Sequence, residues 1–400
     1  MNNFEHLVSQ FQSVFETNTY PQLFFAPGRI NLIGEHTDYN GGHVFPASIS
    51  YGTYALAGKR EDKKLRLYSV NFPTDAFIEF DIRDLSQRSH DWTDYPKGVL
   101  LFLQKAGYSI NHGIDLLFYG NIPNGAGLSS SASIEIVTGV MAKALYDLDI
   151  EKLELVKIGQ KVENDFIGVN SGIMDQFAVG MGKENHAILL NCETLEFSYS
   201  PFQLQDYTLI IIDTNKQRTL AGSKYNERRH ECESALVDLQ KDMSIQFLCE
   251  LSPQLFEKYE HLITNSINKK RAKHVIYENA RTQIALEKLQ QYDLIGFGQL
   301  MNESHQSLRD DYEVSCLELD TIVEEAWNIQ GVIGARMTGA GFGGCALALV
   351  ANEQVNNFKQ KIHHTYTEKI GYEPTFYTPT IGDGAKEIND VTPQTSNERL

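Results

Sequence analysis

The residues best suited to chemistry lie in Pro123–Ser133, which reads Pro-Asn-Gly-Ala-Gly-Leu-Ser-Ser-Ser-Ala-Ser and runs into a helical pattern over 134–148. Gly125 and Gly127 lack the Cβ atoms that would hold a phosphate away from the main chain. The serines suit a helix N-terminus, where free N–H groups and the positive end of the helix dipole face an anion. Taken alone, the segment is compatible both with a phosphate cradle and with a glycine turn followed by an ordinary helix cap.

The segment Ala26–Pro46 carries a second chemical signal, because Glu35, His36 and Asp38 stand together on a glycine-bounded loop. Two carboxylates and an imidazole side by side can hold several hydroxyl groups of a small polyol. A metal site is a weaker interpretation, since the chain supplies no matching pair of further ligands. A solvated turn is a third interpretation, which the segment alone does not exclude.

The segment Arg336–Ala346, RMTGAGFGGCA, matches the G-x-G-x-x-G pattern of dinucleotide-binding folds at Gly339, Gly341 and Gly344. A strand-like run over 345–350 follows it, where that fold requires a helix, so we reject a Rossmann site. Close packing of the turn against another backbone or a ligand explains the glycines better. The chain also lacks GxxxxGK[ST], which argues against a P-loop enzyme.

The elements that must position these segments follow from hydrophobic periodicity. Strands are expected over 23–26, 30–33, 51–57, 64–70, 76–82 and 113–119, and helices over 134–148, 151–167 and 173–179. A strand pair over 187–191 and 195–199 comes before residue 201. The second half is expected to hold strands over 209–212, 332–337, 345–350 and 375–380, and helices over 225–239, 272–289, 295–308, 316–327 and 355–366. The polar tail beyond Asp383 is expected to be loosely held.

Length and composition describe an ordinary globular protein of 400 residues, which predicts two domains, 1–200 and 201–400. The net charge of −17 argues against nucleic acid or an anionic membrane as partner. A nucleotide would therefore need local help from helix dipoles, backbone amides and Mg²⁺. The chain begins without a secretory signal pattern, has no long apolar run and has five scattered cysteines, so we expect a cytoplasmic protein.

Three glycine-rich segments of this wording, in this order, resemble the GHMP kinase superfamily, named after its galactokinase, homoserine, mevalonate and phosphomevalonate members. The run GRINLIGEHTDYN over Gly28–Asn40 is similar to the galactokinase branch in particular. The resemblance extends from about Phe24 to Gly384. It implies an α+β fold of two domains, an N-terminal mixed sheet with helices (ribosomal protein S5 domain 2-like) and a C-terminal ferredoxin-like domain. The active site is expected in the cleft between them.

The resemblance places the phosphates of ATP on the run Gly125, Ala126, Gly127, Leu128, Ser129, Ser130 and Ser131. It pairs Ser131 with Glu163 as the holders of Mg²⁺, for which a hydroxyl and a carboxylate are ordinary ligands. Without the resemblance, Glu163 would be a solvated carboxylate on a helix face. Ser69 is implied as a further contact on the nucleotide side.

The resemblance makes Asp175 the catalytic carboxylate and Arg29 its partner. Asp175 is expected in the first turn of a short helix, where the helix dipole and Arg29 would stabilise its negative charge. Phosphoryl transfer passes through a loose transition state that needs little early deprotonation. We therefore expect Asp175 to orient the sugar hydroxyl and accept its proton late, while Arg29 neutralises charge on the moving phosphoryl group. The alternative is that Asp175 is a helix carboxylate with no role in a reaction.

Sugar recognition is expected from the set Glu35, His36, Thr37, Asp38, Gly172, Asp175 and Tyr225. Spacing alone would make Tyr225 a core residue of the helix over 225–239, and only the resemblance makes it a ligand contact. Which carboxylate reads which hydroxyl is left open.

The activity implied is ATP-dependent phosphorylation of the anomeric hydroxyl of α-D-galactose to galactose 1-phosphate, the first committed step of galactose catabolism by the Leloir pathway. The implied partners are galactose and ATP with Mg²⁺, on a monomer. One alternative is a sibling sugar 1-kinase for N-acetylgalactosamine or arabinose. Another is a non-catalytic sensor of galactose and ATP, which should carry damage in the phosphate loop or at the carboxylate, whereas Ser131 and Asp175 are both present.

Overall fold

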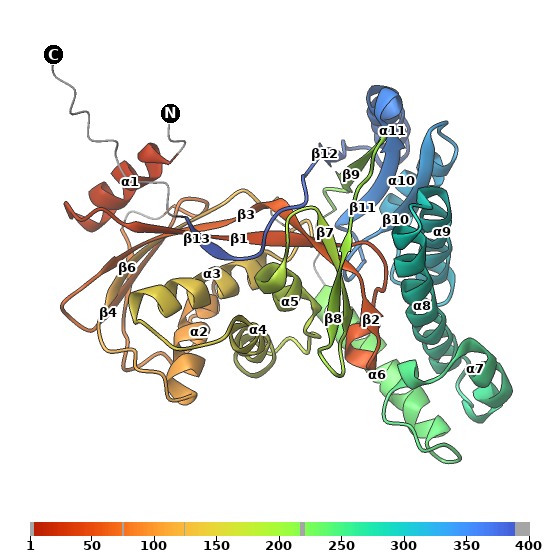
Figure 1. Ribbon diagram of the computed structural model, residues 1–400, viewed down its shortest axis with the longest axis horizontal. Coiled ribbons are helices and arrows are strands. Elements are labelled where there is room, and N and C mark those ends of the chain that lie inside the picture. The colour runs from red at the N-terminus through yellow and green to blue at the C-terminus, as the bar shows by residue number, and fades with distance from the viewer. Residues whose placement is uncertain (1–3, 74–75, 124, 217–220, 389–400) are drawn as a thin grey trace.

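The computed structural model describes residues 4–73, 76–123, 125–216 and 221–388. Its strands form three sheets, with the orders β13-β1-β3-β6-β4-β5, β10-β11-β9-β12 and β2-β7-β8. Figure 1 shows the six-stranded sheet at one end of the molecule, the four-stranded sheet at the other and the three-stranded sheet between them.

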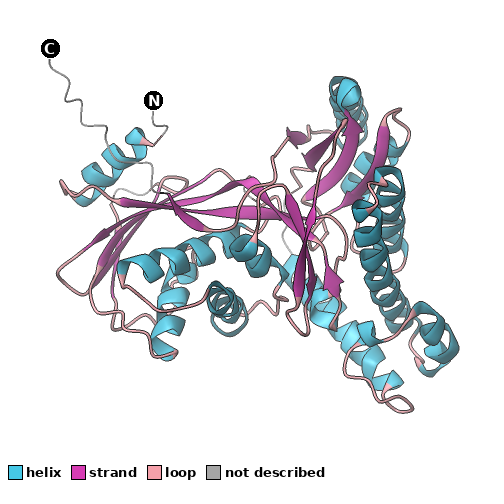
Figure 2. Cartoon of the chain, in the orientation of Figure 1, coloured by secondary structure: helices cyan, strands magenta, loops and turns pink. Residues whose placement is uncertain are grey.

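The six-stranded sheet is built from β1 (Gln22–Asn31), β3 (Pro46–Lys59), β4 (Lys64–Ser69), β5 (Ile78–Asp81), β6 (Ile114–Gly120) and β13 (Lys386–Ile388). Its helices are α1 (Glu5–Phe15), α2 (Asp94–Lys105), α3 (Ser130–Leu145), α4 (Lys152–Lys161) and α5 (Met174–Met181), which Figure 2 shows in cyan. The sheet is mixed, because β4 runs parallel to β6 and every other pair is antiparallel.

Strand alternation divides this sheet between two hydrophobic clusters, since successive side chains point to opposite faces. Leu23 and Leu56 pack under α1, whereas their neighbours Phe24 and Ala55 belong to the large core under α2, α3, α4 and α5. Figure 1 shows α1 alone on one face of the sheet and the other four helices on the opposite face.

The four-stranded sheet consists of β9 (Tyr207–Asp213), β10 (Val332–Met337), β11 (Cys345–Ala351) and β12 (Thr375–Tyr377). All of its pairs are antiparallel, and in chain order the strands lie 2-3-1-4, which is the ferredoxin-like arrangement. Its helices are α6 (Ala221–Leu239), α7 (Pro253–Tyr259), α8 (Ser266–Gln290), α9 (Leu294–Asp310), α10 (Leu317–Trp327) and α11 (Val355–Ile370). The expected C-terminal fold is therefore confirmed.

The connecting sheet contains β2 (His43–Val44), β7 (His186–Asn191) and β8 (Phe197–Pro201). One hydrophobic cluster joins the two ends of the molecule, because Ile30 and Phe45 share it with Ile211, Phe297 and Leu347. The proposed division between 1–200 and 201–400 falls within β8, and β13 crosses back to the first sheet.

Several sequence-based expectations need correction. The run over 23–26 and the first half of the run over 30–33 form the single strand β1, which ends at Asn31 and whose pairing with β3 is interrupted between Pro27 and Arg29. The helix expected over 151–167 ends at Lys161 and continues as a π-helical turn, Val162–Ile167. The tail beyond Asp383 is held in part, because Ala385 is buried and β13 pairs with β1. Helices α1, α2 and α7 were not predicted from the sequence.

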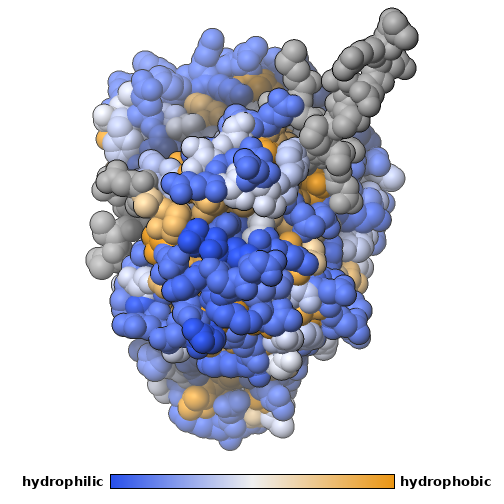
Figure 3. Space-filling view, turned by 90° about the vertical axis from the view of Figure 1, so that its left-hand side faces the viewer, coloured by the Kyte–Doolittle hydropathy of each residue, from blue (hydrophilic) through white to orange (hydrophobic). Residues whose placement is uncertain are grey.

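The surface agrees with the composition. Figure 3 shows the end of the molecule that carries the first sheet, and hydrophilic residues dominate it, with apolar residues in small patches. Within the described parts of the chain, every helix is too short or too polar to span a bilayer.

Candidate active site

All three glycine-rich segments meet at one cavity of about 290 Å³. The first segment contributes Arg29, Glu35, His36 and Asp38, the second contributes Ser131, and the third contributes Gly339 and Ala340. The remaining lining residues are Glu163, Val169, Ser171, Gly172, Met174, Asp175 and Tyr225. We call this the polar cavity.

A second cavity of about 350 Å³ adjoins it, and Ser131 lines both. Its walls include the aromatic side chains of Phe72, Trp92, Tyr95 and Phe118, and its lining also includes Ser69, Gly125 and Ser130. A cavity that combines aromatic walls with a glycine and serines at a helix N-terminus suits a planar base that carries a phosphate chain. We call this the aromatic cavity.

Arg29 is placed by the irregularity in β1. A Cβ on Gly28 would lie 2.6 Å from the Leu128 carbonyl oxygen, so only glycine allows the strand to approach the second segment this closely. The Arg29 amide then donates to that carbonyl at 3.1 Å, and its Nη1 donates to the Gly127 carbonyl at 2.8 Å. The first and second segments are thus joined through one arginine.

The same guanidinium reaches Asp175 in the first turn of α5. Arg29 Nε donates to Asp175 Oδ1 at 2.9 Å, and Nη2 lies 3.2 Å from Oδ2. Ser129 Oγ donates to Oδ2 at 2.6 Å, from a residue with φ of +62° at the N-cap of α3. The carboxylate is therefore fixed on the wall of the polar cavity by two charge-assisted contacts from Arg29 and by one hydroxyl of the second segment.

The expected phosphate run offers mainly its backbone and its serines. Ala126 and Leu128 are buried in the cluster that joins the two ends of the molecule, so their side chains face away from the aromatic cavity. Gly125 has a φ of +75° and open space around the position of a Cβ. Ser130 begins α3, whose first amides face the cavity wall. Asn124 lies outside the described residues.

Glu163 and Ser131 lie together on the wall of the polar cavity. Glu163 is 7 % exposed and is hydrogen-bonded by Ser171 and Ser131. Burial raises the pKa of Glu163, and the Asp175 carboxylate raises it further. A buried carboxylate beside a hydroxyl, facing the phosphate run, fits a Mg²⁺ ion that keeps several waters and phosphate oxygens. In the described part of the chain, no group of three or more His, Cys, Asp and Glu side chains forms a metal site.

Glu35 is buried beneath the polar cavity and holds the first segment to the third. Its carboxylate lies 3.1 Å from Arg336 Nη2 and accepts the Gly339 amide at 2.6 Å. Asn31 also donates to it. Burial raises the pKa of Glu35, although Arg336 opposes that effect. The third segment also packs closely against other backbone, as expected, since a Cβ on Gly341 would lie 2.3 Å from the Val314 carbonyl oxygen, and β11 follows it in place of a helix.

His36 and Asp38 follow on the same loop and line the polar cavity. Burial lowers the pKa of His36 to about 3, so its ring is neutral near pH 7. Burial and the nearby Asp175 charge raise the pKa of Asp38 to about 7. A Cβ on Gly172 would lie 2.0 Å from Asp38 Oδ2, so Gly172 leaves the space that this carboxyl occupies.

Tyr225 and Thr37 differ from each other in their placement. Tyr225, on α6, lines the polar cavity, and its ring centroid lies 5.6 Å from that of His36. Thr37 is fully buried outside the lining, with its hydroxyl 2.7 Å from the His43 carbonyl oxygen and 2.9 Å from that of Gly34. Its side chain therefore shapes the loop and does not face the polar cavity.

Sequence reasoning missed several groups at the site. Ser171 bonds Glu163, and its place beside Gly172 gave only a weak signal. Arg336 stands inside the third segment, but nothing in the sequence predicted that it pairs with Glu35. Trp92 and Tyr95 escaped notice because the turn and helix that carry them were not predicted.

Comparisons with known proteins agree with this geometry. The model of the galactokinase galactose-binding signature matches residues 9–59, the GHMP kinases N terminal domain matches 94–183, and the GHMP kinases C terminal domain matches 285–367. A galactokinase of Clostridium beijerinckii is 53% identical over 389 residues, covering 97% of this chain and 100% of that protein. A galactokinase of Ligilactobacillus salivarius is 55% identical over 366 residues, covering 91% and 95%.

Among solved structures, the galactokinase of Lactococcus lactis complexed with galactose matches with a TM-score of 0.95 and 50% identity, covering 96% of this chain and 100% of that one. The mevalonate kinase of Methanococcus jannaschii matches with a TM-score of 0.64 at 18% identity, covering 92% and 100%, which indicates a shared fold alone.

Proposed function

The chain belongs to the galactokinase family of the GHMP kinases, and from this premise we propose that it transfers the γ-phosphoryl group of ATP to the anomeric hydroxyl of galactose. The observation that supports this best is the place of Asp175. Its carboxylate lines the cavity that holds the hydroxyl-binding groups, and it is held by Arg29 and by Ser129, a residue of the phosphate-type loop that borders the second cavity.

In the proposed reaction, galactose occupies the polar cavity with its anomeric hydroxyl at Asp175. Glu35, His36, Asp38 and Tyr225 supply acceptors and donors for the other hydroxyls, and the Gly172 backbone closes the same wall. A wrong epimer leaves one of these buried groups unpaired, which costs about 1–3 kcal/mol. Thr37 contributes through the loop that it shapes.

The proposed ATP pose places the base in the aromatic cavity, beside Ser69 and Trp92, and its phosphates along Gly125–Ser131. Asp175 orients the sugar oxygen and takes its proton as the new O–P bond forms. Arg29 faces the same point and stabilises negative charge that develops on the transferred group. ADP leaves from the aromatic cavity once the O–P bond to the γ-phosphoryl group has broken.

Mg²⁺ would be held by Ser131 and Glu163, together with phosphate oxygens, and would neutralise phosphate charge. An acidic protein needs such a cation to accept a polyanion, since the chain carries a net charge of −17. We also propose that the enzyme acts in the cytoplasm, where ATP is available, and as a monomer.

The decisive experiment is ADP release from Mg-ATP in the presence of galactose, N-acetylgalactosamine, arabinose, glucose, mevalonate or homoserine. Turnover confined to galactose supports the proposal. Turnover on N-acetylgalactosamine or arabinose in place of galactose would replace it with a sibling sugar kinase. Galactose binding without turnover on any acceptor would favour a sensor, although the intact Arg29–Asp175 pair argues against that reading.

Substitution Ser131→Ala tests the metal assignment. It removes the hydroxyl paired with Glu163, so the KM for Mg-ATP is expected to rise by about tenfold, the loss of one charge-assisted contact. Galactose affinity, measured by calorimetry without nucleotide, should change little. Ser9→Ala, at an exposed position of α1, is the matched control. Lost galactose affinity with an unchanged KM for Mg-ATP would remove Ser131 from the metal site.

A further inference from the structure

A chain of hydrogen bonds runs from the polar cavity into the helical region behind it. His36 Nδ1 lies 2.7 Å from the Tyr39 hydroxyl, which lies 2.8 Å from the Tyr312 hydroxyl. Tyr312 in turn lies 3.2 Å from Cys232 Sγ on α6. Tyr312 is fully buried, so its hydroxyl does not hydrogen-bond to bulk solvent. The mechanism proposed above uses neither Tyr39 nor Tyr312.

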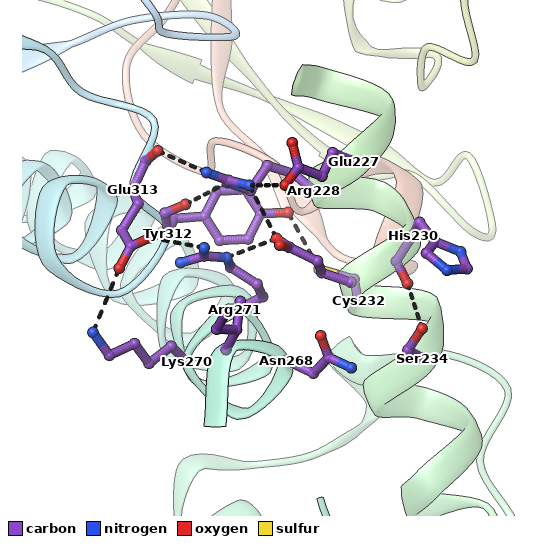
Figure 4. Close-up of polar contacts among 12 residues, drawn as sticks. Glu227, Arg228, His230, Cys232, Ser234, Asn268, Lys270, Arg271, Tyr312 and Glu313 are labelled. Atoms are coloured by element: carbon purple, nitrogen blue, oxygen red, sulfur yellow. Dashed lines mark hydrogen bonds and ion pairs between the residues drawn. The ribbon is translucent and has the colours of Figure 1, made fainter. Parts of the chain in front are cut away.

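Two arginines hold the turn that carries Tyr312. Arg228 Nε donates to the Tyr312 carbonyl at 2.8 Å, and its Nη2 donates to the Glu313 carbonyl at 3.1 Å. Arg271 Nη1 donates to the Asp311 carbonyl at 2.7 Å. Figure 4 shows Arg228 from α6 on one side of the Tyr312 ring and Arg271 from α8 on the other. Three consecutive carbonyls are therefore anchored to two helices.

The Glu231 carboxylate contacts both arginines and fixes their positions relative to each other. Glu231 Oε2 lies 3.1 Å from Arg228 Nη1 and 2.8 Å from Arg271 Nε. Glu313, which has a φ of +55°, adds a contact of 2.9 Å to Arg271 Nη2. A network of this size around one short turn fixes the tyrosine that it carries more firmly than isolated surface pairs would.

The direction of donation along the chain follows from the donor and acceptor strengths of its members. His36 Nε2 has no hydrogen-bond partner among the described residues, so the contact at Nδ1 is the one that sets the tautomer. A phenol O–H is a stronger donor than a neutral imidazole N–H, and an imidazole nitrogen is a stronger acceptor than a phenol oxygen. Tyr39 therefore donates to His36 Nδ1, and its oxygen is left to accept from Tyr312.

We propose that Tyr312 and Tyr39 are positioning residues that keep the His36 hydrogen on Nε2, so that the polar cavity presents a hydrogen-bond donor beside its acceptor carboxylates. A buried sugar hydroxyl needs both an acceptor for its hydrogen and a donor for its oxygen. Glu35 and Asp38 offer acceptors when ionised. A neutral imidazole whose Nδ1 accepts from Tyr39 supplies the matching donor. The substrate part of this proposal rests on the proposed function.

The test uses Tyr39→Phe, Tyr312→Phe and the double variant in the full-length enzyme. Each single variant removes one hydroxyl, and each is expected to raise the KM for galactose by about three- to tenfold, with the KM for Mg-ATP unchanged. Because both hydroxyls act through His36, the double variant should match Tyr39→Phe alone instead of multiplying the two effects. The matched control is Tyr366→Phe on α11, which also loses a fully buried hydroxyl, bonded at 2.6 Å to the Thr214 carbonyl.

Nitrogen-15 NMR of histidine-labelled protein reads the tautomer directly, with the His36 signal assigned by its loss in His36→Asn. The proposal requires hydrogen on Nε2 in the natural protein and a mixture of tautomers in both tyrosine variants. Hydrogen on Nδ1 in the natural protein, or tyrosine effects on galactose KM no larger than that of Tyr366→Phe, would overturn it. If galactose is not a substrate, the kinetic part fails with the proposed function, whereas the spectrum still decides the tautomer.

Discussion

The Asp175 carboxylate illustrates how much chemistry depends on a single residue's surroundings. It receives contacts from Arg29 and Ser129 in the substrate-free protein, so both of its oxygens already have donors. A carboxylate stabilised in this way is a weak base, which suits a reaction whose transition state needs little early proton transfer. Ser129, which is expected to contact phosphate, also donates its hydroxyl to Asp175 at 2.6 Å.

Substitution Asp175→Ala is expected to lower kcat by about 10²–10⁴-fold, the usual contribution of a positioned acid–base group. The measurement is ADP release at saturating galactose and Mg-ATP. Circular dichroism should report an intact fold, because Asp175 is only half-buried. Asp165→Ala, at an exposed position, serves as control. Turnover within a factor of three of the natural enzyme would exclude Asp175 from the chemical step.

Asp38 should make galactose binding depend on pH. Its pKa is raised to about 7 by burial and by the Asp175 charge, so the neutral acid dominates below pH 7 and the carboxylate above. If the carboxylate is the form that accepts a sugar hydroxyl, galactose affinity improves as pH rises from 6 to 8. Calorimetric titration at several pH values checks this, and Asp38→Asn should flatten the profile.

The raised pKa of Asp38 also makes the stability of the fold depend on pH, in the opposite direction to galactose affinity. An unfolded chain ionises Asp38 near its ordinary value of 3.8, whereas the folded protein holds the proton up to about pH 7. The stabilising contribution of the neutral form is therefore lost as pH rises from about 4 to 7. Asp38→Asn should raise the melting temperature at pH 8 and leave it nearly unchanged at pH 4. The exposed Asp149→Asn should show no such pH-dependent gain.

At the scale of elements, close backbone approaches position the parts that carry the site. Helix α9 touches β10 through Gly298 and Gly334, where a Cβ on Gly298 would lie 2.2 Å from the Ile333 carbonyl oxygen. Two residues after Gly334, β10 carries Arg336, whose guanidinium contacts the Glu35 carboxylate. The irregularity in β1 plays the corresponding part for Arg29, since Gly28 permits contact with the Leu128 carbonyl.

Substitution Gly298→Ala is expected to lower the free energy of unfolding by about 1–3 kcal/mol, because the added methyl group meets backbone atoms that cannot turn aside. Chemical denaturation measures the change. Gln299→Ala, at the exposed neighbouring position of α9, should change stability by less than about 0.5 kcal/mol. Equal stability of Gly298→Ala and the natural protein would show that α9 can move away from β10 without cost.

At the scale of the whole molecule, the first and third segments join the two sheets around the site. Thr338 accepts the Asn31 amide at 3.1 Å and donates to the Asn31 carbonyl at 3.1 Å. Glu35 adds the contacts to Arg336 and Gly339. These segments lie about 300 residues apart in the chain, so the polar cavity exists only when both sheets are folded and packed together.

Substitution Arg336→Gln leaves the fully buried Glu35 without its cation, which is expected to cost about 3–5 kcal/mol of stability. The double variant Glu35→Gln with Arg336→Gln should recover a large part of that loss, because no uncompensated charge remains. Denaturation of the two single variants and the double variant forms the cycle. Additive losses would mean that the two side chains are not coupled across the molecule.

Most elements of the fold and of the site could be predicted where the sequence pattern reflects local structure. The three glycine-rich segments, most strands and the long helices have residue patterns that reflect local backbone geometry, and the structure confirms them. The missed elements have physical reasons. Strand β13 is short and polar and gains its order from pairing with β1, and α2 begins at Asp94 without a clear cap. The π-helical turn that places Glu163 follows α4 with no change of pattern in the sequence.

The sequence by itself determined the chemistry on offer: a phosphate-type loop, a hydroxyl-binding loop, a carboxylate in a helix's first turn and a family resemblance that joins them. Only the tertiary structure decided which groups touch. It assigned Ser129 to Asp175, Arg336 to Glu35 and Tyr312 to the His36 chain, and it turned Thr37 away from the cavity. The reason is that glycine requirements and helix periodicity act over a few residues, whereas these contacts depend on strand register and on the packing of segments from 46 to about 300 positions apart.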